Sequence, residues 1–333
     1  MIISRSPVRI TLGGGGTDLP SYYSKYGGAL IAAAIDKYTL VTAHTRFDDE
    51  IKLNYSQTEI VEKIEDIKHN IFREALKLLN INNRIELTSL SDMPSSSGLG
   101  TSGSFTIALL NALHTYKKEF VSQKQLAEEA CHIEMEILKE PIGKQDQYIS
   151  AFGGITYLEF EKDGTVKVEP VHMTEEARDE LQHNIILFYT GIQRSASKIL
   201  REQDEKSKKD ENKTIETLHE IKRIGLDTKK AFEKGDVDKL GEYLDEHWNI
   251  KKRLSHGVSN TFIDECYNHA IKNGALGGKI MGAGGGGFFI FYHNGNNTEK
   301  TAFIREMAKK GLKKMRYNFD FEGTKIVLNM RNI

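Results

Sequence analysis

The chain has 333 residues, with 46 basic and 47 acidic side chains and a net charge of −1. This length is enough for two domains, and the balanced charge argues against a general nucleic-acid-binding surface without excluding a local basic pocket. No apolar run approaches the length that spans a bilayer, and the first residues lack the apolar core of a signal peptide. The two cysteines, Cys131 and Cys266, lie too far apart to indicate a disulfide framework or a structural zinc site. We therefore expect a cytoplasmic protein that binds neither nucleic acid nor membrane.

Strands and helices alternate in the prediction for the first half of the chain. β-rich or alternating runs predict strands, and apolar residues at helical spacing predict helices. The expected strands cover residues 8–12, 38–43, 51–55, 85–90 and 155–160, and the expected helices cover 71–79, 105–117 and 122–138. In the last helix, Leu126, Ala130, Ile133 and Ile137 share one face, which places Glu134 on the polar side.

The second half has longer and more charged helices. A strand at 185–189 precedes helices over 195–256 and 260–273, and the apolar run 288–292 predicts a buried strand. A helix at 298–311 and a strand at 325–329 complete the chain. The dense charges at 201–213 are typical of a solvated helix face. The whole order is an α+β pattern, for which we expect an N-terminal domain over 1–170 and a C-terminal domain over 171–333.

The glycines gather in three places, at 13–16, 98–103 and 274–287, each flanked by apolar periodic sequence. Such flanks indicate ordered loops rather than flexible linkers. The segment 94–104 reads PSSSGLGTSGS and lies between a predicted strand and a predicted helix. Glycines let a backbone approach an anion, and free N–H groups at a helix start bind it. This segment therefore predicts a phosphate-binding loop.

Two known nucleotide-binding motifs could account for such a phosphate-binding loop. Gly98-x-Gly100-x-x-Gly103 has the dinucleotide-binding spacing, but helix follows where that fold requires a second strand. A Walker P-loop is absent from the sequence, and the nearest candidate, Gly278-Lys279, has Asn273 in place of its first glycine. The sequence therefore supports neither a dinucleotide-binding motif nor a Walker P-loop.

Taken together, the three clusters resemble the signature motifs of the GHMP small-molecule kinase family. Residues 9–18 read RITLGGGGTD, 94–104 form the second motif, and 279–287 read KIMGAGGGG. The stretches 13–23, 35–38 and 143–147 resemble the sugar-1-kinase branch, most of all the D-glycero-D-manno-heptose 7-phosphate kinases. Galactokinases carry Gly-Glu-His-Thr-Asp at the first motif, so the resemblance speaks against galactose as substrate.

The resemblance implies an N-terminal ribosomal S5 domain 2-like domain and a C-terminal ferredoxin-like domain, with the active site between them. It implies an ATP- and Mg²⁺-dependent kinase that converts a heptose 7-phosphate to the 1,7-bisphosphate at the anomeric hydroxyl, in nucleotide-activated heptose synthesis for bacterial surface glycans. The expected partner is a small sugar phosphate, and the protein is expected to be a monomer or homodimer. A fucokinase-like enzyme and a catalytically silent sugar or nucleotide sensor stay as alternatives.

The resemblance also implies residue roles. Asp146 is the candidate base and Arg9 its companion beside the transferred phosphoryl group, although the local sequence would also suit an N-cap or turn aspartate. Ser102 and Glu134 are the candidate Mg²⁺ contacts, although a lone helix glutamate is usually solvent-facing. The ATP-binding loop comprises Pro94, Ser95, Ser96, Ser97, Gly98, Leu99, Gly100, Thr101, Ser102, Gly103 and Ser104.

The sugar site needs hydrogen-bonding groups and a cation for the distal phosphate. Asp18 is expected to bind sugar hydroxyls, and Arg194 is the first choice for the phosphate because a guanidinium grips it bidentately. Lys25 and Lys37 are further candidate cations, and each candidate could instead be an ordinary surface cation. The predicted substrate-binding set is Gly14, Gly15, Gly16, Thr17, Asp18, Lys144, Arg194, Lys198, Gly284 and Gly285.

Overall fold

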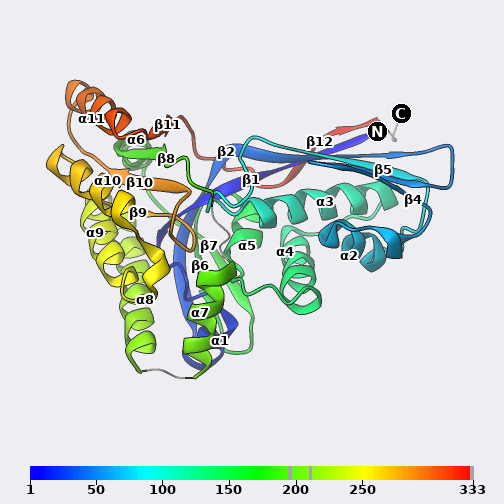
Figure 1. Ribbon diagram of the computed structural model, residues 1–333, viewed down its shortest axis with the longest axis horizontal. Coiled ribbons are helices and arrows are strands. Elements are labelled where there is room, and N and C mark those ends of the chain that lie inside the picture. The colour runs from blue at the N-terminus through cyan, green and yellow to red at the C-terminus, as the bar shows by residue number, and fades with distance from the viewer. Residues whose placement is uncertain (194–196, 210–211, 331–333) are drawn as a thin grey trace.

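The computed structural model describes residues 1–193, 197–209 and 212–330, which form two β-sheets with helices packed on them (Figure 1). The strands are β1 (Ile2–Gly13), β2 (Gly28–Thr45), β3 (Ile51–Asn54), β4 (Thr58–Val61), β5 (Ile85–Ser91), β6 (Ile155–Phe160), β7 (Val166–Pro170), β8 (Ile185–Tyr189), β9 (Gly277–Ile280), β10 (Phe288–Tyr292), β11 (Lys313–Met315) and β12 (Lys325–Asn329).

Eleven α-helices and three short helical turns connect these strands within the described residues. The α-helices are α1 (Pro20–Tyr26), α2 (Asn70–Leu78), α3 (Thr101–Lys117), α4 (Gln123–Cys131), α5 (Gln145–Phe152), α6 (Glu175–Asn184), α7 (Ser197–Lys208), α8 (Asn212–Glu233), α9 (Lys239–Lys251), α10 (Thr261–Lys272) and α11 (Asn297–Lys309). The short turns are η1 (Ile64–Asp66), η2 (His132–Ile137) and η3 (His256–Val258), of which η2 is a π-helix.

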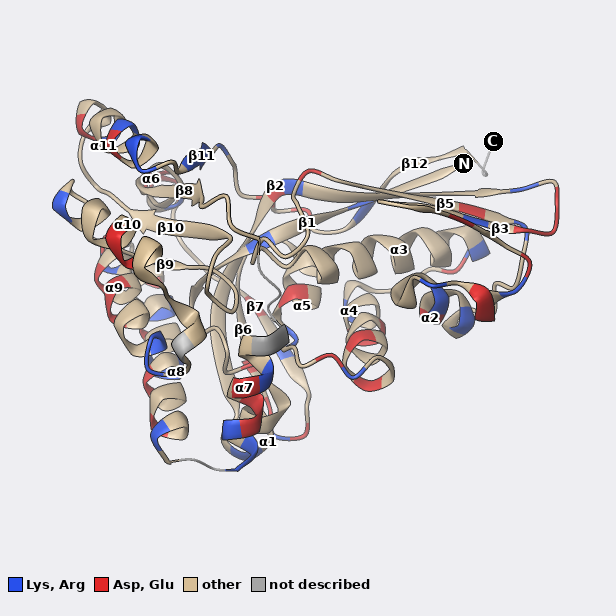
Figure 2. Ribbon diagram, in the orientation of Figure 1, with Lys and Arg blue, Asp and Glu red and all other residues tan. Residues whose placement is uncertain are grey.

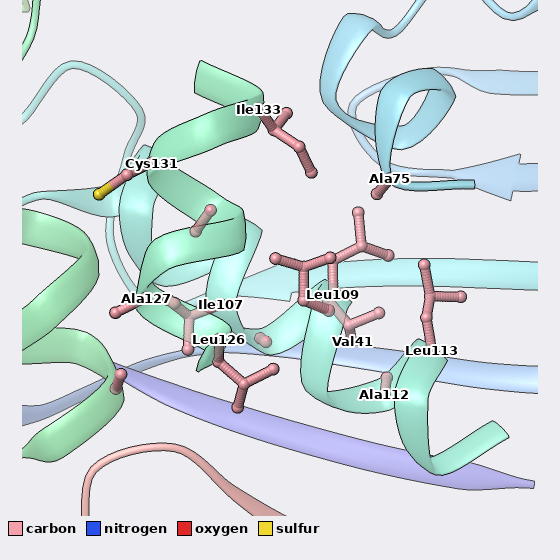
Figure 3. Packing of buried hydrophobic residues seen from close by; sticks show 14 of the residues in the cluster. Val41, Ala75, Ile107, Leu109, Ala112, Leu113, Leu126, Ala127, Cys131 and Ile133 are labelled. Atoms are coloured by element: carbon pink, nitrogen blue, oxygen red, sulfur yellow. The ribbon is translucent and has the colours of Figure 1, made fainter. Parts of the chain in front are cut away.

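The first sheet has the strand order β12-β1-β2-β5-β3-β4, and β6 and β7 branch from it. Strand β2 is long enough to pair with β5 through residues 39–45 and with β6 through residues 28–33. Helix α3 packs under β1 and β2, and Figure 2 shows it almost free of charged side chains. In Figure 3, Leu109 and Leu113 of this helix lie in one cluster with Val41 of β2.

The second sheet is antiparallel with the order β11-β8-β10-β9. Numbered within this half, the strands stand in the order 4-1-3-2, with helices between the first and second and between the third and fourth. This is the ferredoxin-like arrangement expected from the sequence. Apolar side chains of both sheets, among them Ile10 and Ile290, share one buried cluster, so the two halves pack on a common core.

The structure departs from the sequence prediction in the helix expected over 122–138. Helix α4 ends at Cys131, and the π-helical turn η2 follows. A π-turn holds more residues than an α-turn and therefore rotates the following side chains. Leu126, Ala130 and Ile133 are buried as expected, but Ile137 is 39% exposed. The prediction of one continuous apolar face was wrong at its last position.

Several elements were not predicted. Strand β2 begins at Gly28 rather than near residue 38, and β9 occupies part of the expected glycine loop. Helices α1, α5 and α6 also went unpredicted, each of them ten residues or shorter. Across the described ranges, no helix combines the length and apolarity needed to cross a membrane.

Candidate active site

A cleft of about 510 Å³ lies where the three glycine-rich segments meet. Its wall takes residues from β1, the start of α3, the η2 turn, the start of α5, the end of α9 and strand β9. Both halves of the chain therefore contribute to one site. The cleft is the expected place for the predicted catalytic and binding residues.

Arg9 and Asp146 form an ion pair in this cleft. Arg9 lies on β1 with only 3% of its surface exposed, and both its Nε and one terminal nitrogen lie 2.7 Å from Asp146 Oδ1. Its other terminal nitrogen donates to the carbonyl of Gly98 at 2.6 Å. Asp146 lies in the first turn of α5, while Lys144 is the N-cap residue, so the N-cap alternative for Asp146 was wrong. One guanidinium thus joins the candidate base to the phosphate loop.

Glu134 is buried, contrary to the expectation of a polar helix side. It is 2% exposed and accepts hydrogen bonds from Ser102 Oγ at 2.6 Å and Gln147 Nε2 at 3.0 Å. Burial is the main cause that raises its pKa. Among the described residues no cation forms an ion pair with Glu134. The π-turn η2 carries this side chain towards the start of α3.

The carboxylate of Glu134 and the hydroxyl of Ser102 suit a divalent cation. Mg²⁺ prefers oxygen ligands, and it usually binds one or two carboxylates while keeping water and substrate phosphate as further ligands. A buried carboxylate without a cationic partner and a neighbouring hydroxyl fit that requirement. Within the described ranges, no cluster of three or more His, Cys, Asp or Glu side chains offers a closed metal cage. Glu134 and Ser102 could therefore hold Mg²⁺ only together with nucleotide and water.

The second glycine segment has the backbone of an anion loop. Gly98 and Gly100 have φ values of 80° and 77°, and Gly100 is the N-cap of α3 without a side-chain cap. The first N–H groups of α3 are therefore available to a ligand. The predicted loop residues that line the cleft are Ser96, Gly98, Gly100, Thr101, Ser102 and Gly103.

Other residues of the predicted ATP loop support it from behind. Leu99 is buried in the core, and its carbonyl accepts the backbone N–H of Arg9 at 2.9 Å. Ser104 is fully buried and donates to the carbonyl of Ser6 at 2.8 Å. Pro94, Ser95 and Ser97 are likewise absent from the cleft lining, and of these three only Ser97 is buried. Leu99 and Ser104 therefore support the loop, whereas Ser95 is exposed to solvent.

The first glycine segment forms another part of the cleft wall. Gly15, Gly16 and Asp18 line the cleft. Asp18 accepts the backbone N–H groups of Gly16 and Gln145, both at 3.1 Å, and burial is the main cause that raises its pKa. Gly14 and Thr17 lie behind, where Thr17 Oγ1 donates to the Gly14 carbonyl at 2.9 Å. Asp18 thus connects the first segment to the start of the helix that carries Asp146.

The third segment contacts the second directly. A Cβ on Gly282 would lie 2.8 Å from the Cα of Gly98, so the close approach of the two loops requires glycine. Lys279, Ile280, Met281, Gly282 and Ala283 line the cleft, but Gly284 and Gly285 do not. The N–H of Gly285 donates to Val258 at 2.8 Å on the far side of the loop. These two glycines support the loop and do not face the predicted sugar site.

The structure brings none of the described candidate phosphate-binding lysines into the cleft. Lys144 donates to the carbonyl of Gly164 at 2.6 Å and stacks over Tyr23, and Lys37 bonds to Asp36. Lys25 is not among the lining residues. Arg194 lies outside the described residues, as does the side chain of Lys198. The cation for a distal phosphate stays a prediction.

Two groups of lining residues escaped the sequence analysis. The basic side chains His247 and Lys251 meet Lys279 of the third motif in the cleft wall, where Lys279 Nζ lies 3.0 Å from His247 Nδ1. The start of α2 also lines the cleft with residues 68–71. His247 and Lys251 belong to a charged helical stretch, so nothing in the local sequence marked them as cleft residues.

The amino-acid sequence is similar to those of known proteins. The description "GHMP kinases N terminal domain" matches residues 63–154, and "GHMP kinases C terminal" matches residues 228–311. A D-glycero-alpha-D-manno-heptose 7-phosphate kinase from Campylobacter jejuni is 32% identical, over 97% of this chain and 98% of that protein. The chain belongs to the GHMP kinase family. Membership confirms the predicted family and fold.

Two further relatives bear on the activity of this kinase. An L-fucokinase/L-fucose-1-P guanylyltransferase from Bacteroides fragilis is 25% identical, over 85% of this chain and 34% of that protein. A solved D-glycero-D-manno-heptose 1-phosphate kinase from Bacteroides thetaiotaomicron superposes with a TM-score of 0.82 at 26% identity, covering 99% of both chains. The protein is a sugar kinase, a phosphotransferase that uses ATP as donor and an alcohol group as acceptor.

Proposed function

We propose that this kinase phosphorylates the anomeric C1 hydroxyl of D-glycero-D-manno-heptose 7-phosphate to give the 1,7-bisphosphate. The observation that carries the chemistry is the Arg9–Asp146 pair, which lines the same cleft as the first glycine segment and is bonded to the phosphate loop at Gly98. The likeness to the Campylobacter jejuni heptose 7-phosphate kinase over nearly the full length supports the choice of sugar.

The cleft residues suggest how the transfer proceeds. Phosphoryl transfer depends mostly on positioning and charge neutralisation. Asp146, oriented by its ion pair with Arg9, accepts or orients the proton of the attacking sugar hydroxyl. Asp18 binds sugar hydroxyls, and the free N–H groups at the start of α3 bind the nucleotide phosphates. Glu134 and Ser102 would hold Mg²⁺, which would supply positive charge to neutralise the phosphate chain.

A second regiochemistry has one specific observation in its favour. The Bacteroides thetaiotaomicron neighbour is described as a heptose 1-phosphate kinase, and such an enzyme would phosphorylate C7 and yield the same bisphosphate. The fucokinase-like relative supports an unphosphorylated sugar as a third candidate. A silent sensor is disfavoured, because binding alone does not need Asp146, Glu134, Arg9 and Ser102 together.

The deciding experiment offers the kinase ATP, Mg²⁺ and a panel of sugars. The panel contains heptose 7-phosphate, heptose 1-phosphate, the free heptose and free hexoses. We expect turnover on heptose 7-phosphate, with the new phosphate assigned to C1 by ³¹P NMR. Preference for an unphosphorylated hexose or for heptose 1-phosphate would overturn the assignment. In a second test, Arg194→Ala should raise KM for the sugar phosphate and leave KM for ATP unchanged.

We also propose the context in which the kinase works. Residues 1–170 would form the N-terminal domain and 171–333 the C-terminal domain, with β12 returning to pair with β1. The two family descriptions fall on either side of residue 170, which supports this division. The enzyme would act in the cytoplasm, as a monomer or homodimer, in the synthesis of nucleotide-activated heptose for surface glycans.

A further inference from the structure

We propose that Lys251, at the end of α9, binds the phosphate chain of ATP, supplying the cation that the phosphate loop lacks, and that it takes up a proton when the nucleotide binds. The phosphate loop of residues 94–104 contains no lysine or arginine. This inference depends on ATP as the donor and is independent of which sugar accepts the phosphate.

The position of Lys251 is set by the third glycine segment. Its Nζ donates to the carbonyl of Gly282 and lies 3.4 Å from that of Ile280. A lysine ammonium has three N–H donors, so two of them hold the loop and one is left. Lys251 also lines the cleft, into which the third donor can point. The side chain is therefore oriented before any ligand arrives.

The phosphate loop lies next to this ammonium. Gly282, which Lys251 holds, packs against Gly98, and Gly98 also accepts a hydrogen bond from Arg9. A phosphate that binds at the N–H groups of this loop would thus meet Arg9 from the first half of the chain and Lys251 from the second. The loop N–H groups, Arg9 and Lys251 would then neutralise the charge of a triphosphate from three sides.

The charges around Lys251 favour an anion. Arg9 of β1 is the cation whose field reaches Lys251. The charge of Lys251 in turn helps to lower the pKa of Lys279 on β9, whose Nζ lies 3.0 Å from Nδ1 of His247, one turn earlier on α9. Asp146 is paired with Arg9, and within the described residues neither lysine forms an ion pair with a carboxylate. Strand β10 presents only apolar or tyrosine side chains. Helix α8 presents Glu220 and Arg223, which pair with Arg253 and Glu246.

Crowded cations without counter-ions lose protons readily. Burial and the neighbouring Arg9 lower the pKa of Lys251 to about 7, and burial lowers the pKa values of Lys279 and His247 well below their usual range. A bound phosphate chain favours the charged form and raises the pKa again. Above pH 7 the free enzyme therefore takes up a proton as nucleotide binds, and nucleotide affinity falls as the pH rises.

The experiment measures binding of AMP-PNP, ADP and adenosine by titration calorimetry, with Mg²⁺ and without sugar. Titrations at pH 8 in two buffers of different ionisation enthalpy give the number of protons taken up. Lys251→Met should weaken AMP-PNP and ADP on the order of 10- to 100-fold, the range of a hydrogen bond to a charged group. Adenosine should bind as to the wild type, and the proton uptake assigned to Lys251 should disappear.

Two further variants keep the test decisive. Lys252→Met removes the adjacent lysine, which is exposed and stacks over Trp248, and should leave affinity and proton uptake unchanged. Lys251→Arg should retain most of the affinity but lose the proton uptake, because a guanidinium stays protonated. Equal losses for adenosine and AMP-PNP in Lys251→Met would indicate a collapsed loop and overturn the proposal. Wild-type proton uptake in either Lys251 variant would overturn it as well. All these outcomes are independent of the heptose assignment.

Discussion

A single methyl group at Gly103 tests whether the position of Asp146 controls activity. Gly103 lies in the first turn of α3, where that helix crosses α5. A Cβ there would lie 2.8 Å from the Cβ of Asp146 and 3.0 Å from its carbonyl carbon and from the backbone N of Gln147. To reach an ordinary carbon–carbon contact of about 3.5 Å, the two helices must separate by roughly 0.7 Å.

Stability and activity should respond differently to Gly103→Ala. Alanine is favoured over glycine within a helix by about 1 kcal/mol, while overpacking costs about 1–3 kcal/mol, so the net loss of stability is at most about 2 kcal/mol. Displacement of a catalytic group by about 1 Å can cost on the order of 100-fold in rate. We therefore expect kcat to fall between about 10- and 100-fold, with a modest fall in Tm.

The assay is a coupled ADP-release measurement of kcat and of both KM values, with Tm measured in parallel. Gly103→Ser extends the series, because its hydroxyl adds bulk in the same place and should lower kcat further. A Gly103→Ala enzyme with the wild-type kcat would show that the position of Asp146 within α5 does not limit the reaction. A large rise in KM for ATP at unchanged kcat would assign Gly103 to nucleotide binding instead.

Three other substitutions probe the candidate base, the candidate metal site and a buried histidine. Asp146→Asn should keep ATP and sugar binding by calorimetry while turnover falls by orders of magnitude, and near-normal turnover would remove Asp146 from the mechanism. Glu134→Gln can still bond to its two neighbours but loses its charge, so the Mg²⁺ concentration for half-maximal rate should rise; an unchanged Mg²⁺ dependence would exclude Glu134 as a ligand. His114 bridges Glu119 and Glu129, which raises its pKa against the opposing effect of burial. Its stabilising effect is complete below the unfolded pKa of about 6.5 and is lost as pH rises through the folded pKa. In urea unfolding, the stability deficit of His114→Gln should therefore be larger at low pH than at high pH, and a pH-independent deficit would contradict this.

The sequence predicted well what depends on local pattern. Strands β6, β8, β10 and β12 follow from continuous apolar or β-branched runs, and their predicted boundaries match those in the structure. The first part of β2 was missed because residues 32–34 are three alanines, which carry little strand preference. Its pairing with β6, more than 100 residues away in the chain, decides its conformation.

Long-range packing also explains what was missed at the site. From the sequence, Glu134 is expected to be a surface residue on a regular helix. The π-turn in which it is buried cannot be predicted from the spacing of the apolar residues. Lys251 reads as part of a charged helix, and it is enclosed because the end of α9 packs on β9. The roles predicted for Arg9, Ser102 and Asp146 rested on family resemblance, and the structure adds the bonds that join them to one cleft.

The cleft separates its charges in a way that suits a triphosphate. Near the start of α3, Glu134 supplies a carboxylate that forms no ion pair with any described residue, while Arg9 supplies a cation beside Gly98 and Lys251, when protonated, supplies one beside Gly282. A nucleotide with its metal would neutralise both ends at once, whereas a metal or a phosphate alone would leave one end uncompensated. Mg²⁺ and ATP should therefore bind cooperatively, each raising the affinity of the other by the same factor. Titration of AMP-PNP with and without Mg²⁺ measures that factor. It should shrink in Glu134→Gln and persist in Lys252→Met, and a factor of one in the wild type would refute this view of the cleft.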